Sequence, residues 1–127
     1  MKLRIKGNSL RVRVTRSELM KLIDTGHIEE TIYFSSNEQS RLTYALEHEF
    51  GLNSPTIRYQ SPEVVIVLPK KEAATWAESN QVGIYASVDL GPHGTLDLIV
   101  EKDFACLDLS DADNLDTFPN PNVAGIC

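Results

Sequence analysis

The chain has 127 residues, enough for one domain with its own core, and its 42% hydrophobic and 24% charged residues are typical of a globular protein. No apolar run reaches the roughly 20 residues of a membrane-crossing helix, and no apolar segment follows the basic N-terminus, so we expect a cytoplasmic protein without a signal peptide. The net charge of −6 is unevenly placed, since residues 1–21 carry +6 and the rest −12. This asymmetry predicts a basic face on an acidic body.

Alternation and capping residues predict a ββαββ unit in residues 2–50. Thr15 and Glu18 stand three positions apart, as in a capping box at the start of a helix, and Gly26 is placed to end that helix in a left-handed conformation. Gly7-Asn8-Ser9 predicts a turn. Apolar residues alternate with polar ones in four segments, which we expect to be half-buried strands at residues 3–6, 10–14, 28–34 and 42–50.

The same plan returns 54 positions later, where residues 56–104 follow residues 2–50 without a gap. Trp76 takes the place of an apolar helix residue, and Asn80 takes the place of Gly26, so we expect Asn80 to be a left-handed helix end. The identical pairs are Arg4/Arg58, Glu18/Glu72, Leu42/Leu96, Glu47/Glu101 and Phe50/Phe104. The pattern therefore predicts two pseudo-repeats, against the alternative of two unrelated units of similar length.

The two halves differ on one strand. Arg11 and Arg13 become Val65 and Val67, so this second strand is apolar on both faces. Such strands are usually covered on both faces. We expect a partner subunit or the segment after Phe104 to cover these valines. That segment, residues 105–127, has no periodicity, and its candidate apolar anchors are Leu107, Leu109, Leu115 and Phe118.

The run Gly7-Asn8-Ser9-Leu10-Arg11-Val12-Arg13-Val14, followed by Glu18-Leu19, resembles the opening of AbrB/MazE-like swapped-hairpin DNA-binding proteins. In that family two ββαββ-type chains interlock into one barrel, and basic side chains near the turn touch DNA. Thr15 stands where the family usually has proline, and the second half has Ser61-Pro62-Glu63 in place of the turn. The nucleic-acid-binding residues that the resemblance and the shared strand face imply are Arg4, Lys6, Asn8, Arg11 and Arg13.

A second resemblance spans most of the chain. Small uncharacterised bacterial proteins open with Arg-Ile-Lys-Gly-Asn-Ser, here residues 4–9, and carry Glu-Lys-Asp-Phe-x-Cys-Leu, here residues 101–107. This resemblance implies no activity.

Metal and catalytic motifs do not emerge from the sequence. Cys106 and Cys127 form no close pair of the kind that zinc sites use, with His27, His48 or His93 as the remaining candidates, and the Asp-rich tail lacks the EF-hand glycine and glutamate. No nucleophile elbow, P-loop or dinucleotide-binding motif is present. We interpret the pairs Glu29-Glu30 and Glu47/Glu49 as solvated strand faces. We therefore expect no enzyme activity, no metal and no cofactor.

These observations predict an α+β fold in which two ββαββ repeats form one small swapped-hairpin-like β-barrel, or a sandwich, with two short helices. The expected domain covers residues 1–104, and residues 105–127 form a coil tail packed on it. The expected function is a regulator that binds DNA or a protein partner, with a homodimer as an arrangement that would double the basic face. The alternative is a protein-interaction or scaffold domain that does not bind DNA.

Overall fold

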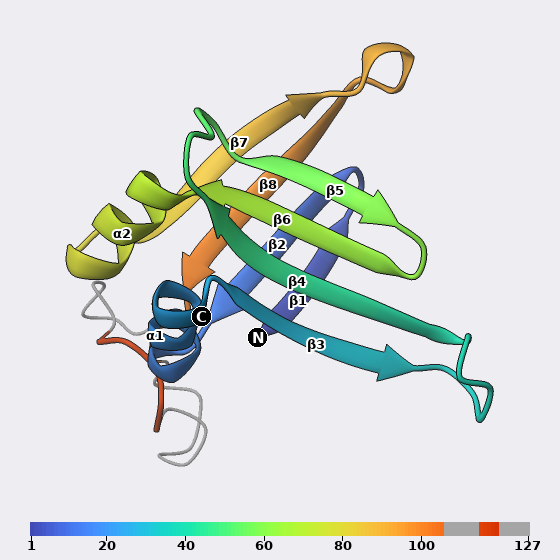
Figure 1. The fold of residues 1–127 in the computed structure, drawn as a ribbon, viewed down its shortest axis with the longest axis horizontal. Coiled ribbons are helices and arrows are strands. Elements are labelled where there is room, and N and C mark those ends of the chain that lie inside the picture. The colour runs from blue at the N-terminus through green and yellow to red at the C-terminus, as the bar shows by residue number, and fades with distance from the viewer. Residues whose placement is uncertain (106–114, 120–127) are drawn as a thin grey trace.

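The computed structural model describes residues 1–105 and 115–119, and it confirms the predicted α+β class (Figure 1). Within these residues, two strands, a helix and two strands follow one another and then recur in the same order. The strands are β1 (Lys2–Lys6), β2 (Ser9–Val14), β3 (His27–Tyr33), β4 (Arg41–Glu49), β5 (Thr56–Gln60), β6 (Glu63–Pro69), β7 (Gly83–Asp89) and β8 (Thr95–Lys102). The helices are α1 (Arg16–Thr25), α2 (Lys70–Glu78) and a short 3-10 turn, η1 (Gly91–His93).

The strands form two four-stranded sheets, and each sheet takes one hairpin from each half of the chain. Sheet A has the order β1-β2-β8-β7 and sheet B the order β3-β4-β6-β5. The halves join through two parallel pairs, β2 with β8 and β4 with β6, whereas the hairpin partners are antiparallel. Figure 1 shows the strands of sheet B crossing in front of those of sheet A, with α1 and α2 at one end.

The predicted closed barrel is wrong, because the two sheets do not join at their edges. Within the described residues no ladder links an edge strand of sheet A, β1 or β7, to an edge strand of sheet B, β3 or β5. A barrel requires every strand to pair on both sides. Here the two halves are already joined through the central parallel pairs, and stacking the sheets buries the apolar faces instead. The division into the repeats 2–50 and 56–104 stays a prediction.

The core lies between the sheets and against the inner faces of the helices. Trp76 of α2 is fully buried, as predicted, and its indole Nε1 donates a hydrogen bond to the Val82 carbonyl at 3.1 Å. Burying a large aromatic side chain of this kind contributes several kcal/mol, so Trp76 anchors this end of the sandwich. The buried residues of this core are Val12, Val14, Leu19, Leu22, Ile28, Leu46, Ile66, Leu68, Ala73, Trp76, Ile84, Leu98 and Val100.

The apolar phase predicted for β3 is buried at only one position. Ile28 is 4% exposed, but Ile32 is 48% exposed and Phe34, beyond the end of the strand, is 65% exposed. The reason is that β3 is an edge strand whose far end extends, with β4, away from the helices (Figure 1). Glu30, the polar residue in this phase, accepts a hydrogen bond from the Met1 ammonium at 2.7 Å.

The predicted start and end of α1 are confirmed. The Thr15 hydroxyl accepts from the Glu18 backbone N–H, and the Glu18 carboxylate accepts from the Thr15 backbone N–H at 2.9 Å, which completes the capping box. Gly26 follows the helix with φ of 82°, and its N–H donates to the Leu22 carbonyl. A left-handed glycine at this place satisfies a carbonyl group that would otherwise lack a partner.

The predicted end of α2 is wrong. The helix follows Pro69 without a side-chain cap and ends at Ser79, whose backbone is extended. Within the described residues only glycines have positive φ, so Asn80 is not left-handed. The reason lies in the tertiary structure, because the Lys102 ammonium donates to the Ser79 carbonyl at 2.7 Å. A side chain from β8 thus satisfies this helix end in place of a left-handed residue.

Two of the predicted contacts outside the repeats have a clear outcome. Val65 and Val67 are 7% and 2% exposed, and Leu52 of the linker between the halves packs against them. Within the described residues the linker therefore contributes to their cover through Leu52, and the sequence reasoning did not consider this segment. Phe118 packs against the main core and meets Phe104 edge to face, with ring centroids 6.1 Å apart.

The tail also contacts α1, where the Arg16 N–H donates to the Asp116 carbonyl at 3.0 Å and Ser17 donates to the Asp116 carboxylate. Leu115 is 86% exposed, so the prediction that it anchors the tail is wrong. The other predicted anchors and both cysteines lie outside the described residues: Leu107, Leu109, Cys106 and Cys127.

Candidate nucleic-acid interface

Four basic side chains predicted to share a face do so on the outer side of sheet A: Arg4, Lys6, Arg11 and Arg13. The register pairs Arg4 with Arg11 across the β1–β2 hairpin, and it adds Lys2 to this face as the partner of Arg13. Side chains at paired positions point to the same side of a sheet, and the intervening apolar positions point to the opposite side, where Val12 and Val14 are buried in the core. Arg4, Lys6 and Arg11 line one shallow hollow on this face. The strand alternation read from the sequence is sufficient to place this group.

The cations on this face are not equally free. Lys2 forms an ion pair with Asp103 at 3.0 Å. The Arg11 Nε lies 3.5 Å from a Glu101 carboxylate oxygen, without the geometry of a hydrogen bond. Among the residues that the structure describes, the remaining cations form no ion pair or side-chain hydrogen bond; these are Arg4, Lys6 and Arg13. These three positive charges are available to an anionic partner.

Asn8 lies in the predicted turn between β1 and β2. Its side-chain amide donates to the Thr95 carbonyl at 2.7 Å, and its own carbonyl accepts from the Asp97 N–H at 3.1 Å. Asn8 therefore ties the β1–β2 turn to the start of β8. Its amide nitrogen is hydrogen-bonded within the fold. Asn8 contributes to the basic face by supporting the turn that follows Lys6.

The other half of this face, on β8 and β7, is acidic and aromatic. The Tyr85 hydroxyl donates to the Glu101 carboxylate at 2.8 Å, and Ser87 donates to Asp97 at 2.7 Å. Burial, and after it the hydrogen bond to Glu101, raises the pKa of Tyr85 to about 12, so the phenol stays protonated at neutral pH. Tyr85 remains 57% exposed. Sequence reasoning missed Tyr85, although it alternates on β7 with the buried Ile84.

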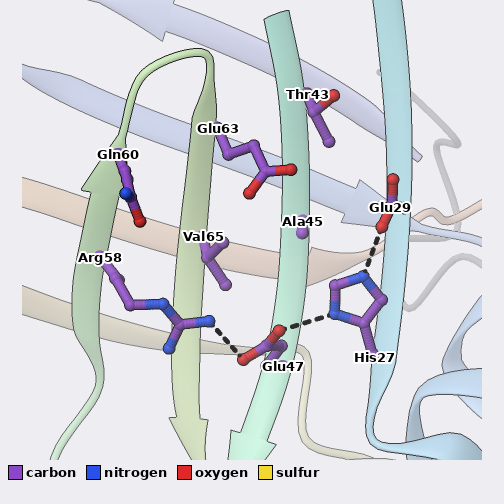
Figure 2. A pocket seen from close by; sticks show the side chains of 9 residues that line it. All are labelled: His27, Glu29, Thr43, Ala45, Glu47, Arg58, Gln60, Glu63 and Val65. Carbon is purple, nitrogen blue, oxygen red and sulfur yellow. Dashed lines mark hydrogen bonds and ion pairs between the residues drawn. The ribbon is translucent and has the colours of Figure 1, made fainter.

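The outer face of sheet B carries a contrasting polar hollow, with a volume of about 80 Å³ (Figure 2). Its floor is formed by the small residues Ala45 and Val65, and larger polar side chains surround it. Figure 2 shows Glu47 between two basic side chains: Arg58 reaches it from β5 at 2.7 Å, and His27 from β3 at 2.7 Å. This ion-pair cluster ties both edge strands of sheet B to its centre.

His27 is held between two carboxylates. Its Nδ1 lies 2.7 Å from Glu47 and its Nε2 lies 2.8 Å from Glu29. Two carboxylates accept best from a ring that is protonated on both nitrogens. The hydrogen bond to Glu29, followed by that to Glu47, accordingly outweighs burial and raises the pKa of His27 above its ordinary value of 6.5.

This cluster is poorly suited to acid–base catalysis. Both ring nitrogens of His27 are engaged, so neither is free to take a proton from a substrate. Thr43, the one hydroxyl among the described residues that line the hollow, is 5% exposed and bonded to Thr31 at 2.7 Å. Burial alone would raise the pKa of Glu47, but its bonds from Arg58 and His27 lower it. Glu47 thus lies on the outer face of the sheet with 22% of its side chain exposed, within an ion-pair cluster that its interpretation as a solvated strand residue did not include.

Two signals in the sequence could have pointed to the Glu47 cluster. His27 and Glu29 are two positions apart on one strand, and Glu47 belongs to a pair that is identical in both halves. What the sequence lacked was the order of the strands in sheet B, in which β3 brings His27 to Glu47 of β4, and β5 brings Arg58 to it across β6. Within the described part of the chain no group of three His, Cys, Asp or Glu side chains is placed to hold a metal ion. None of its helices has the length and apolar character needed to cross a membrane.

Comparison with known proteins identifies a family without an assigned activity. No curated protein and no solved structure matches the chain. The family model of the family of unknown function DUF7009 matches residues 1–122, and it carries no link to the AbrB/MazE-like proteins. Because this match covers nearly the whole chain, the protein belongs to the family of unknown function DUF7009.

Proposed function

We propose that the protein is a non-enzymatic binding protein, a DNA-binding regulator, that holds nucleic acid against the cationic half of sheet A. The observation that carries the proposal is the group of three unpaired cations, Arg4, Lys6 and Arg13, on one outward face. Phosphate contacts of this kind supply most of the sequence-independent affinity for nucleic acid. The rest of the chain is acidic, and its repulsion of phosphate lowers the affinity.

Three free cations set the expected strength and salt dependence. With about 0.9 of a counterion released per phosphate contact, three contacts predict that affinity falls roughly 40-fold between 50 and 200 mM salt. Binding by one chain is therefore weak at physiological salt. A symmetric dimer with two such faces side by side would double the number of contacts.

The test is a fluorescence polarisation titration of labelled DNA at 20 and 150 mM salt. The variant carries three changes to alanine on the cationic face: Arg4→Ala, Lys6→Ala and Arg13→Ala. The matched control removes the same number of exposed lysines from the helices: Lys21→Ala, Lys70→Ala and Lys71→Ala.

Both variants have the same net charge, so only the position of the lost charges differs between them. We expect the face variant to lose binding more than tenfold at 20 mM salt and the helix variant to lose little. Absence of binding by the wild type at 20 mM salt, or equal losses in the two variants, would contradict the proposal. Unchanged thermal melting of the face variant shows that its loss is not one of folding.

A second candidate function, protein interaction without DNA binding, is favoured by the exposed apolar end of β3. Ile32, Tyr33 and Phe34 are 48%, 53% and 65% exposed and consecutive. Contiguous exposed apolar side chains often mark protein interfaces. If this end pairs two copies of the chain, the wild type sediments as a dimer and the Ile32→Ser/Phe34→Ser variant as a monomer. Monomeric wild type at high concentration would exclude this pairing.

The support for an internal duplication is the strand order. Each position in sheet A, read from β1 to β7, has its counterpart 54 residues away in sheet B, read from β5 to β3. We propose that two ββαββ repeats, residues 2–50 and 56–104, exchange hairpins to build the sandwich. A superposition of the two segments that fails to align these strands in order would exclude the duplication.

A further inference from the structure

We propose that the ligand of sheet A is a single strand of nucleic acid, whose phosphates follow β1 and β2 and whose bases lie over β8 and β7 with Tyr85 as a stacking platform. This inference rests on the proposed function and specifies the class of ligand at the same face. The observation that supports it is that one half of the outer face of sheet A is cationic, and the other half is aromatic and acidic.

The two halves meet at Ile99, an outward-facing residue of β8. The register places Ile99 beside Arg11 on one side and Tyr85 on the other. Ile99 lines both the hollow of the cationic half and the adjoining hollow of the Tyr85 half. The face is therefore continuous from β1 to β7, with an apolar floor at its centre. Neighbouring strands are about 4.8 Å apart, so Arg11 and Tyr85 stand roughly 10 Å apart across the sheet.

The side chain of Tyr85 is exposed, and contacts within the fold hold it in place. Its hydroxyl is held by Glu101, and it lies 3.1 Å from where a Cβ on Gly83 would stand. The ring thus leans along β7 over a residue without a side chain. A Cβ at Gly83 would also come within 2.5 Å of the Val100 carbonyl oxygen and 2.9 Å of Glu101, so the glycine allows β8 to approach closely and leaves room for the pair. A held, 57% exposed aromatic ring can stack on a base of any sequence.

The acidic residues of this face favour binding of a single strand over binding of a duplex. Asp97 and Glu101 lie on β8, next to the cationic hairpin, and Asp89 lies at the end of β7. A duplex laid on the sheet would bring its second phosphate row toward these carboxylates, and like charges would repel. A single strand has one phosphate row, and its unpaired bases carry N–H groups, such as N3–H of thymine, from which a carboxylate can accept. The same charges thus oppose a duplex and tolerate bases.

Three labelled probes test this: a 12-nucleotide thymidine strand, its duplex with the complementary adenosine strand, and a 12-nucleotide abasic strand. The protein is the full chain, measured by fluorescence polarisation at 20 mM salt. We expect the thymidine strand to bind at least fivefold more tightly than either other probe. Tyr85→Ala should weaken binding of the thymidine strand fivefold to a hundredfold without changing binding of the abasic strand, because stacking needs a base.

The conservative variant separates the ring from its hydroxyl. Tyr85→Phe keeps the aromatic ring and loses the hydrogen bond to Glu101, so it should bind the thymidine strand within about threefold of the wild type. A purely structural role for Tyr85 would instead weaken binding of all three probes together.

The outcomes distinguish this inference from the proposed function beneath it. Equal binding of the thymidine strand, the duplex and the abasic strand, abolished by the three-cation variant, would overturn the single-strand inference and leave the proposed function standing. An unchanged Tyr85→Ala titration with the thymidine strand would also overturn it. If the wild type binds none of the probes at 20 mM salt, both fall.

Discussion

Positions 13 and 67 stand 54 residues apart on matching strands of the two halves, and they show how one architecture produces two different surfaces. Arg13 lies on the open outer face of sheet A, where it has no ion pair among the described residues. Val67 is 2% exposed on the outer face of sheet B, under Leu52 of the linker. The linker follows the first half only, so it can cover one sheet and not the other.

The same contrast extends to the identical pairs Glu47/Glu101 and Arg4/Arg58. In sheet B the small side chain of Val65 lets Arg58 reach across β6 to Glu47 at 2.7 Å. In sheet A an arginine stands at the equivalent place, and Arg11 approaches Glu101 itself. Arg4, the counterpart of Arg58, is left unpaired. The two halves differ by Arg11 against Val65 and by Arg13 against Val67. With the valines, the charged side chains of sheet B pair with one another, whereas among the described residues sheet A keeps unpaired positive charges.

The largest expected effect comes from exchanging these positions. Val67→Arg forces a larger, charged side chain into a position that is 2% exposed, and the neighbouring carboxylate of Glu47 is already bonded to Arg58 and His27, so we expect it to lower the free energy of unfolding by about 2–4 kcal/mol. The reverse change, Arg13→Val, affects an exposed face and should cost less than about 0.5 kcal/mol. Urea unfolding followed by circular dichroism measures both. Similar midpoints for the two variants would show that the faces do not differ in burial.

A smaller effect is expected at the two helix ends. Gly26→Ala places a side chain at a left-handed backbone position with φ of 82°. The nearest atom to the added Cβ would be 3.6 Å away, so backbone strain alone should lower the free energy of unfolding by about 1 kcal/mol. Asn80→Gly should change the stability by less than about 0.3 kcal/mol, since α2 ends without a left-handed residue. Thermal melting compares the two variants. A clear increase in stability from Asn80→Gly would mean that α2, like α1, ends with a left-handed residue.

The smallest expected effect is a dependence of stability on pH from His27. Because its folded pKa is raised above 6.5, its contribution is fully present below about pH 6.5 and is lost as the pH rises through the folded pKa. Its side chain is 40% exposed, so screening leaves roughly a few tenths of a kcal/mol. Glu29 and Glu47 bond the ring, and Arg58 beside Glu47 opposes its charge.

Titration of the His27 ring by nuclear magnetic resonance measures this pKa directly. Glu47→Gln should bring it part of the way back toward 6.5, while Glu101→Gln on the other face should leave it unchanged. A His27 pKa at or below 6.5 in the wild type would contradict the arrangement in Figure 2.

The sequence by itself determined the local structure. Alternation of apolar and basic residues fixed β1 and β2 and the shared face of Arg4 and Arg11, because a strand has a strict two-residue period. Thr15, Glu18 and Gly26 fixed α1, because capping depends on residues within one turn of the helix end. These features need no information about the rest of the chain.

The tertiary structure decided what depends on distant partners. It set two open sheets in place of a barrel, the end of α2 through Lys102, and the cover of Val67 through Leu52. It also brought Arg58 of β5 to Glu47 of β4, which lie on the two sides of β6. The physical reason for the Arg58–Glu47 contact is the pairing of hairpins from the two halves in one sheet, which places side chains from different strands on one face.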